Sequence, residues 1–287
     1  MLVVITEATR MAAEHGRTTR RRKLGAALQT LRNEAGMTQV AAANVINLKD
    51  SSLSRIETGT RGASVPQVMA LCQLYRADPA FTEVLVQLAR DAGDPSWWFA
   101  EYGSAVPDWF RGYLDLETDA SEVWTYEAGC VPGLLQTPEY VQAIESVEAA
   151  KRAKLRESRQ QRLHQGHPLM LRAVLDEAAL RRAVGDPGVM REQIRHLAAM
   201  AGLPRVTLRI LPFSAGYHPA ISGSFVVLKF PAPSMDTVYI ELVGGALYAN
   251  KRADVAPYEM TFERLMKQAL GGEETMSFLH EIERSWS

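Results

Sequence analysis

Hydrophobic residues in the first third of the chain recur at the spacing of short α-helices. Four of them lie three or four positions apart and are followed by Gly36: Leu24, Leu28, Leu31 and Ala35. Apolar residues at this spacing form one stripe along a helix, and glycine commonly ends a helix. The pattern predicts a first helix that runs from Lys23 to this glycine.

Four more short helices are predicted after it, at residues 38–45, 50–59, 64–75 and 78–92. Thr38, Asp50 and Asp78 are suited to cap three of them, because their side-chain oxygens can accept hydrogen bonds from backbone N–H groups of a first turn. Asn47 suits the left-handed backbone conformation of a tight turn. Five short helices with tight turns indicate one all-α domain.

We expect this domain to span residues 20–93, after a flexible arm at residues 1–19. The composition changes at Asp94-Pro95-Ser96, after which the chain is rich in aromatic residues. Strands are predicted at residues 122–126, 169–175, 206–211, 224–230 and 237–242, and helices at residues 138–163, 189–200, 257–270 and 273–285. This mixture predicts an α+β domain over residues 94–287.

The helix predicted at residues 50–59 has one packing face and one free face. At about 100° per residue, Leu53, Ile56 and Glu57 share one arc. The opposite arc carries three hydroxyl side chains and one arginine: Ser51, Ser54, Thr58 and Arg55. Short side chains allow a helix to approach the major groove closely, and arginine can bond guanine bidentately. The free face therefore predicts contact with DNA bases.

Charge supports this interpretation once the chain is divided. Residues 1–76 contain eleven Lys and Arg against five Asp and Glu, whereas the whole chain has a formal net charge of −1. The basic residues are densest at Arg20, Arg21, Arg22 and Lys23. Nucleic acid attracts such a local basic surface, so these side chains are either phosphate contacts or a solvated charge run.

The run TQVAAANVINLKDSSLSRIETG, from Thr38 to Gly59, resembles the helix-turn-helix of lambda-repressor-like, or XRE-family, regulators without a gap. The resemblance implies that Asp50, Ser51 and Arg55 face bases. It implies that Gln39 and the loop ending at Arg61 approach phosphates. It also implies an ion pair between Glu57 and an arginine of the first helix, which by position is Arg32.

From these features we predict two sets of DNA-contacting residues. Ser51, Ser52 and Arg55 would contact bases, with Ser54 beside them, and Gln39, Thr60 and Arg61 would hold the backbone. Thr38 begins the preceding helix, whose free amides favour a phosphate. Asp50 would place an acid at the entrance to the groove, where its main role could instead be that of a cap.

The second half resembles a C-terminal domain of unknown function that recurs in actinobacterial XRE regulators described as antitoxin-like. The segments that carry the resemblance are VPGLLQTPEY from Val131, LDEAALRR from Leu175, RILPF from Arg209 and GSF from Gly223. The resemblance implies a small partner protein. It implies no chemical role for any residue.

Other features have weaker functional interpretations. His164 and His167 lie in a predicted loop and offer only two ligands, so we expect no metal site. Asp176, at a strand end, suits either a catalytic carboxylate or a helix cap. The aromatic segment is either core or the wall of a small-molecule pocket, with core favoured. Cys72 and Cys130 are predicted to be buried thiols rather than a disulfide.

We expect no enzymatic activity and no cofactor, because the chain has neither a Gly-rich phosphate loop nor a nucleophile elbow. We also expect a cytoplasmic location without a membrane segment. The leading hypothesis is a transcriptional regulator, a repressor or autoregulator, that binds a double-stranded operator as a homodimer. One alternative is an antitoxin-like protein whose main role is to bind a small partner protein, and another is a ligand-sensing C-terminal domain.

Overall fold

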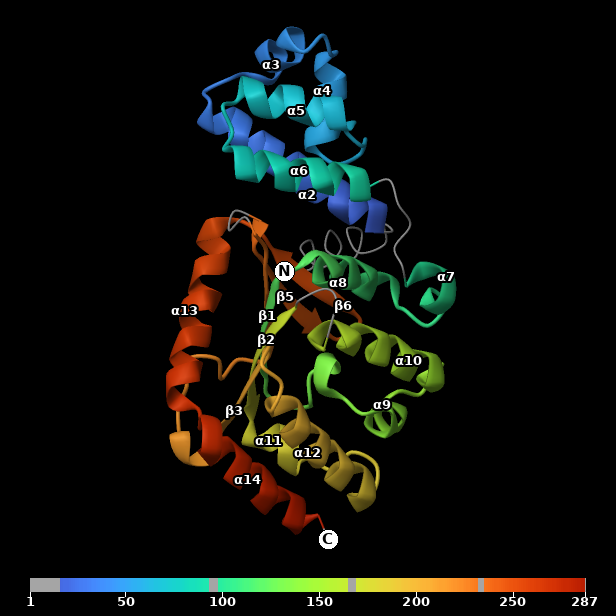
Figure 1. The fold of residues 1–287 in the computed structure, drawn as a ribbon, viewed down its shortest axis with the longest axis vertical. Helices are drawn as coiled ribbons and strands as arrows, with labels where there is room; N and C mark the ends of the chain where they lie inside the picture. The colour runs from blue at the N-terminus through green and yellow to red at the C-terminus, as the bar shows by residue number, and fades with distance from the viewer. Residues whose placement is uncertain (1–15, 93–97, 165–168, 232–234, 287) are drawn as a thin grey trace. The chain divides into compact units, whose positions relative to one another are not determined.

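The computed structural model describes residues 16–92, 98–164, 169–231 and 235–286. The chain forms two compact units, which are treated separately below. The first unit contains the five predicted helices: α2 (Gly16–Glu34), α3 (Gln39–Val45), α4 (Asp50–Glu57), α5 (Val65–Leu74) and α6 (Pro79–Asp91). Figure 1 labels these helices, and the first unit also contains α8 (Asp108–Asp119). An all-α N-terminal domain before an α+β region is confirmed.

Helix α2 begins earlier than the sequence predicts. Residues 16–19, which we assigned to the arm, are helical, and residues 1–15 lie outside the described residues. Arg20 explains the extension, because its guanidinium forms two 2.9 Å bonds to Asp119 of α8 and one of 3.2 Å to the Asp91 carbonyl. The helix therefore includes the whole basic run, residues 20–23, whose first arginine pairs with Asp119.

The turns between the first helices have the geometry that their residues predict. Gly36 and Asn47 have φ of 67° and 52°, in the left-handed region. After α3, the amide of Asn47 donates to the carbonyl of Asn44 and the amide of Leu48 to that of Ala43. These two bonds form the Schellman motif, which satisfies carbonyls at the end of a helix.

Helices α2 and α4 pack unusually closely at Gly25. A Cβ atom at this position would lie 2.3 Å from the carbonyl oxygen of Ile56 and 2.5 Å from that of Glu57. Both oxygens belong to backbone at the end of α4, so they cannot rotate away as a side chain could. The glycine is required by this contact.

Gly25→Ala is therefore expected to destabilise the first unit by about 3 kcal/mol, because overpacking against backbone forces helices apart. Urea denaturation followed by circular dichroism measures the effect. Gly129→Ala is the matched control, since the methyl group would enter open space. Equal stabilities of the two variants would contradict the close packing of α2 on α4.

The segment after residue 97 forms α7 (Phe99–Tyr102) and α8, which the sequence did not predict as helices. Trp98 is fully buried and donates to Asp115 of α8 at 3.1 Å. Tyr113 of α8 is also buried, so much of the aromatic segment forms core. The predicted boundary at Asp94-Pro95-Ser96 lies outside the described residues.

The second unit is built on a six-stranded mixed sheet in the order β3-β2-β1-β4-β5-β6. The strands are β1 (Glu122–Glu127), β2 (Met170–Asp176), β3 (Val206–Leu211), β4 (Phe225–Lys229), β5 (Thr237–Leu242) and β6 (Gly245–Ala249). β1, β2 and β3 are parallel, and β4, β5 and β6 continue the sheet antiparallel. Five of the strands match predictions, and β6 was missed.

The helices of this unit are α9 (Pro138–Ile144), α10 (Ala149–Gln160), α11 (Glu177–Arg181), α12 (Pro187–Ala201), α13 (Arg252–Gln268) and α14 (Gly272–Ser285), with short 3₁₀ turns at Gly133–Leu135, Gln161–Leu163 and Phe213–Ala215. The prediction of a single helix over residues 138–163 is wrong, because α9 and α10 are separate helices. The chain breaks at Glu148, whose φ is 50°, and Glu145 before the break forms ion pairs with Arg152 and Arg156 of α10.

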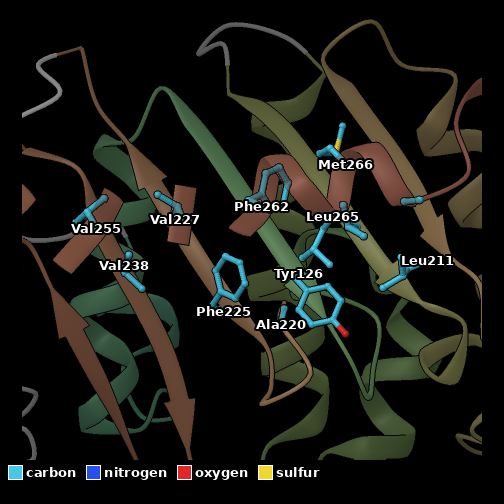
Figure 2. Packing of buried hydrophobic residues seen from close by; sticks show 12 residues of the cluster. Tyr126, Leu211, Ala220, Phe225, Val227, Val238, Val255, Phe262, Leu265 and Met266 are labelled. Atoms are coloured by element: carbon cyan, nitrogen blue, oxygen red, sulfur yellow. The ribbon is translucent and has the colours of Figure 1, made fainter. Parts of the chain in front are cut away.

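One hydrophobic core cluster of the second unit lies between the sheet and α13. Figure 2 shows Phe262, Leu265 and Met266 of α13 beside strands that carry Tyr126 and Phe225, and all five side chains are buried. On the other side of the sheet lies α10 (Figure 1). Helix α13 starts five residues earlier than predicted, so Pro257 lies within the helix rather than at its first position.

Candidate nucleic-acid interface

Helices α3 and α4 form a helix-turn-helix whose second helix is fixed on one side only. Leu53 and Ile56 of α4 are fully buried. Ser51, Arg55 and Thr58 are exposed on the other side. The structure thus places an exposed polar face with one cation on the second helix, as recognition of a major groove requires.

Arg55 lies on this exposed face near the middle of the helix. Its Nε donates to the carbonyl of Ser51 at 3.3 Å, which lays the side chain along the helix surface. Ser54, one turn before Thr58, is half-buried. Arg55 is the side chain of this face that can make the bidentate contact to guanine described above.

Two predicted roles on α4 need correction. Ser52 is only 7% exposed, and its hydroxyl accepts a 3.2 Å bond from Arg61, so it faces the protein and not a base. Asp50 is not the N-cap of the helix, because that position is Lys49. The Asp50 carboxylate instead accepts from the adjacent amide of Ser51 at 2.7 Å.

A buried ion pair joins the first helix to the recognition helix. Arg32 donates from Nε and Nη2 to the two oxygens of Glu57, at 2.7 and 3.0 Å, and both side chains are buried. Gln39 donates to the same carboxylate at 2.8 Å. Arg32 also donates to the carbonyl of Met37 at 2.8 Å. The arrangement fixes α2, α3 and α4 relative to one another.

The loop after α4 is ordered against the end of that helix. The carbonyl of Arg55 accepts from the amide of Arg61 at 2.9 Å and from the Thr60 hydroxyl at 3.1 Å. Both residues are exposed, which keeps them available for the predicted backbone contacts. Thr38, before α3, caps that helix as predicted by accepting from the amide of Ala41.

The basic run lies on α2 and not in an extended arm. Arg21, Arg22 and Lys23 are each half-buried. Gly59, at the end of α4, lies so close to Arg22 that a Cβ atom there would be 2.5 Å from the arginine Cα. These cations therefore lie on α2 beside the end of the recognition helix. They form neither an extended arm nor a fully solvated charge run.

Lys49 is an exposed cation that the predictions omitted. It immediately precedes α4, at the helix end that enters the groove in helix-turn-helix proteins. Its place in the sequence, between the turn and the recognition helix, was the available signal. It adds positive charge beside the acidic Asp50.

The second unit contains a row of polar groups that crosses its sheet. With the strand registers continued by one or two pairs, Glu127 of β1 and Glu241 of β5 lie in line with Ser224, which precedes β4. Burial raises the pKa of Glu127 to about 7; hydrogen bonds with Ser224 and Thr125 oppose the shift, and the charge of Glu241 adds to it. Burial also raises the pKa of Glu241. Glu127 is half-buried and Glu241 is exposed, so the two carboxyl groups lie on one face of the sheet at different depths.

This raised pKa predicts a loss of stability as pH rises from acid to neutral. An acid whose pKa is raised from 4.5 to about 7 on folding stabilises the fold fully below pH 4.5, and this contribution is lost as pH rises through 7. Relative to Glu127→Gln, the parent should lose about 3 kcal/mol between pH 5 and pH 8. Urea unfolding at both pH values measures the difference, with exposed Glu139→Gln as control. Parallel pH profiles for parent and Glu127→Gln would refute the prediction.

Asp176 is a helix cap in the structure. Its Oδ1 accepts from the amide of Ala178 at 2.9 Å, at the start of α11. Its Oδ2 lies 3.4 Å from the Tyr126 hydroxyl and 3.9 Å from Nε2 of buried His218. The adjacent Glu177 accepts from the amide of Phe213 and pairs with Arg181. Both carboxylates thus hold loops in place.

Within the described ranges, no three or more His, Cys, Asp or Glu side chains are arranged to hold a metal ion. His164 is exposed, and His167 lies outside these ranges. Cys72 is buried as predicted, whereas Cys130 is exposed, so the prediction for that thiol is wrong. No helix in the described parts of the chain combines the length and apolar character needed to cross a membrane.

Comparison with protein families finds two matches. Residues 23–85 match a helix-turn-helix domain, and residues 110–281 match a domain of unknown function, DUF5753. No curated protein matches the chain. The first match contains α3 and α4, and the second contains the whole sheet and covers more than half of the chain.

Proposed function

The chain belongs to the family of the domain of unknown function DUF5753, and because a helix-turn-helix domain precedes that domain, we propose that it is a sequence-specific transcriptional regulator. The observation that carries the proposal is the exposed face of α4. It holds Arg55 among small hydroxyl side chains, on a helix that a buried ion pair fixes to its neighbours.

The proposed target is a double-stranded operator in the cytoplasm with two half-sites. One α4 helix spans too few bases for strong specificity, and its free face offers a single arginine. Two copies of the chain, with recognition helices about one helical turn of DNA apart, would double the base contacts. The C-terminal domain would provide dimerisation and an input, and binding at such an operator favours a role as repressor or autoregulator.

Selection of bound duplexes from a random library tests this function. The full-length protein should enrich a sequence with two related halves whose centres lie about 10 base pairs apart, or a multiple of that spacing. Arg55→Ala, carried through the same selection, should fail to enrich the same bases. Recovery of no sequence preference by the parent protein would refute the proposal.

A second candidate function is the binding of a partner protein by the C-terminal domain. The segment between β3 and β4 exposes three large apolar side chains within nine residues: Phe213, Tyr217 and Ile221. Large apolar side chains exposed within one short segment are candidates for a protein contact. Co-purification from the native host should yield a stoichiometric partner that is lost when all three become serine. An unchanged partner would exclude this segment as the binding surface.

A further inference from the structure

Strand β3 is an edge of the sheet, and other backbone segments bond to its free side near both of its ends. At the start, the amide of Val206 donates to the carbonyl of Leu203 at 3.1 Å. Near the end, the amide of Leu270 donates to the carbonyl of Ile210 at 2.8 Å, and these two residues form an antiparallel bridge. Leu208 lies midway between the two contacts.

The backbone N–H and C=O of Leu208 point away from the neighbouring strand β2. In a parallel pair of strands, every second residue directs both of its backbone groups toward the same neighbour. The amide of Leu171 on β2 donates to the carbonyl of Arg205 at 2.9 Å, so the odd-numbered residues of β3 bond to β2 and the even-numbered residues face outward. Among the described residues, none forms a hydrogen bond with the N–H or C=O of Leu208.

Leu208 is nearly buried, with 5% of its surface exposed. Backbone groups in such positions are nearly always hydrogen-bonded, because burial removes the bonds that they would make to bulk water. The outward N–H and C=O therefore favour a further donor and acceptor at this point of the edge. One residue of an added β-strand offers that combination, since its own N–H and C=O can bond to the same partner residue.

An open hollow of about 600 Å³ lies beside Leu208. Ala201, at the end of α12, and the first turns of α14 form its walls, and the two helices pack against each other and against β3 (Figure 1). Leu208 and Met276 provide apolar surface, and Glu273 and Ser277 are exposed. No lysine or arginine is found among the described residues around the hollow. The hollow thus suits an apolar side chain next to a basic one.

We propose that the edge at Leu208 binds a short extended segment of another protein, which adds to the sheet as a further strand. One residue of this segment donates to the Leu208 carbonyl and accepts from the Leu208 N–H. An apolar side chain of the segment lies against Met276, and a lysine or arginine beside it faces Glu273. In this mode of recognition the backbone bonds provide affinity and the side chains provide specificity.

The contacts near both ends of β3 decide what can bind there. At about 3.3 Å per residue, the stretch from Val206 to Ile210 gives room for about three residues of a partner strand. A longer strand would have to displace the bonds that Val206 and Ile210 already make. A helix would leave the Leu208 groups unpaired, because its own N–H and C=O groups bond within the helix. All of these groups belong to the second unit, so the inference goes beyond the proposed recognition of DNA.

Phage display of random heptapeptides on the full-length protein tests the inference. Selected peptides should contain lysine or arginine next to an apolar residue, and fluorescence anisotropy measures their dissociation constants. N-methylation of the one amide that donates to Leu208 should weaken binding at least about tenfold, because it removes a hydrogen bond at a buried acceptor. Methylation of the next amide, which points away from β3, should have little effect. Selection of no peptide, or equal effects of methylation along the peptide, would overturn the proposal.

A matched pair of variants on α14 locates the binding site. Ser277→Trp places a large side chain in the hollow and should weaken peptide binding at least about tenfold. Ser285→Trp is the same substitution at an exposed position beyond the hollow, and it should leave the affinity unchanged. Circular dichroism checks that both proteins are folded. Unchanged affinity of the Ser277→Trp protein would overturn the proposal.

Glu273→Gln tests the charge of the site without changing the shape of its wall. It should weaken the binding of basic peptides about two- to fivefold, as expected for an exposed ion pair. Equal affinity of the parent and this variant would overturn the role assigned to Glu273. Because no DNA is present in these measurements, a protein that binds peptide but selects no duplex would refute the proposed regulatory function alone.

Discussion

Replacing Glu57 by glutamine is expected to destabilise the helix-turn-helix unit by about 3–5 kcal/mol. The carboxylate receives two hydrogen bonds from Arg32 and one from Gln39, and its side chain is only 1% exposed. Glutamine has the same shape but no charge, and it presents an N–H₂ group to a guanidinium. The variant would leave the arginine charge buried without its counter-ion.

Urea unfolding of the full-length protein, followed by circular dichroism, measures this loss. Exposed Glu83→Gln on α6 removes one acid from the same unit and should change stability by less than about 0.5 kcal/mol. A double variant, Arg32→Met with Glu57→Met, should recover part of the loss, because it removes both buried charges. A Glu57→Gln protein as stable as the Glu83→Gln control would show that the pair does not hold the unit together.

The sequence predicts most of the first unit because its signals are local. Gly36 and Asn47 mark turns through their backbone conformations, and Thr38 marks a helix start through its side chain. The Arg32–Glu57 pair was implied by resemblance to a family, and spacing alone would not have identified it. Local turn and capping residues predicted the helices of this unit, and the family resemblance predicted its long-range ion pair.

Ser52 shows how a helix face can be misjudged. It lies four residues before Ile56 and therefore on the same side of the helix, but a serine adds nothing to a hydrophobic pattern. Its burial depends on Arg61, nine residues away, whose guanidinium donates to it. A polar residue can face inward wherever a later side chain provides its hydrogen bond, and the pattern of apolar residues does not record this.

The errors in the second unit have tertiary causes. No glycine or proline marks the break after α9, which is accompanied by ion pairs from Glu145 to arginines on α10. Pro257 suggested a helix start, yet α13 begins at Arg252 and contains it. The missed β6 is short and rich in glycine and alanine, so its strand character comes from pairing with β5. Sequence periodicity detects none of these partners.

Replacing Arg55 by alanine is expected to reduce operator affinity by roughly 30-fold to 10⁴-fold when two copies are bound. One bidentate contact between arginine and guanine provides about 1–3 kcal/mol of discrimination, and a two-fold complex loses two of them. The residue is exposed, and its guanidinium makes only a long contact to the Ser51 carbonyl among the described residues, so the fold should change little. The substitution would therefore reduce the affinity for the operator and leave the stability of the fold nearly unchanged.

Three variants separate base recognition from simple attraction to phosphate. Arg55→Lys keeps the charge but not the planar fork, so it should retain non-specific affinity and lose sequence preference. Arg90→Ala, at the exposed end of α6, removes one cation of the same unit and should leave preference unchanged. Arg61→Ala should weaken binding to all sequences and lower the dependence on salt concentration. Equal loss of affinity for every duplex by Arg55→Ala and Arg61→Ala would mean that Arg55 contacts phosphate, and α4 would then have no strong base-specifying side chain.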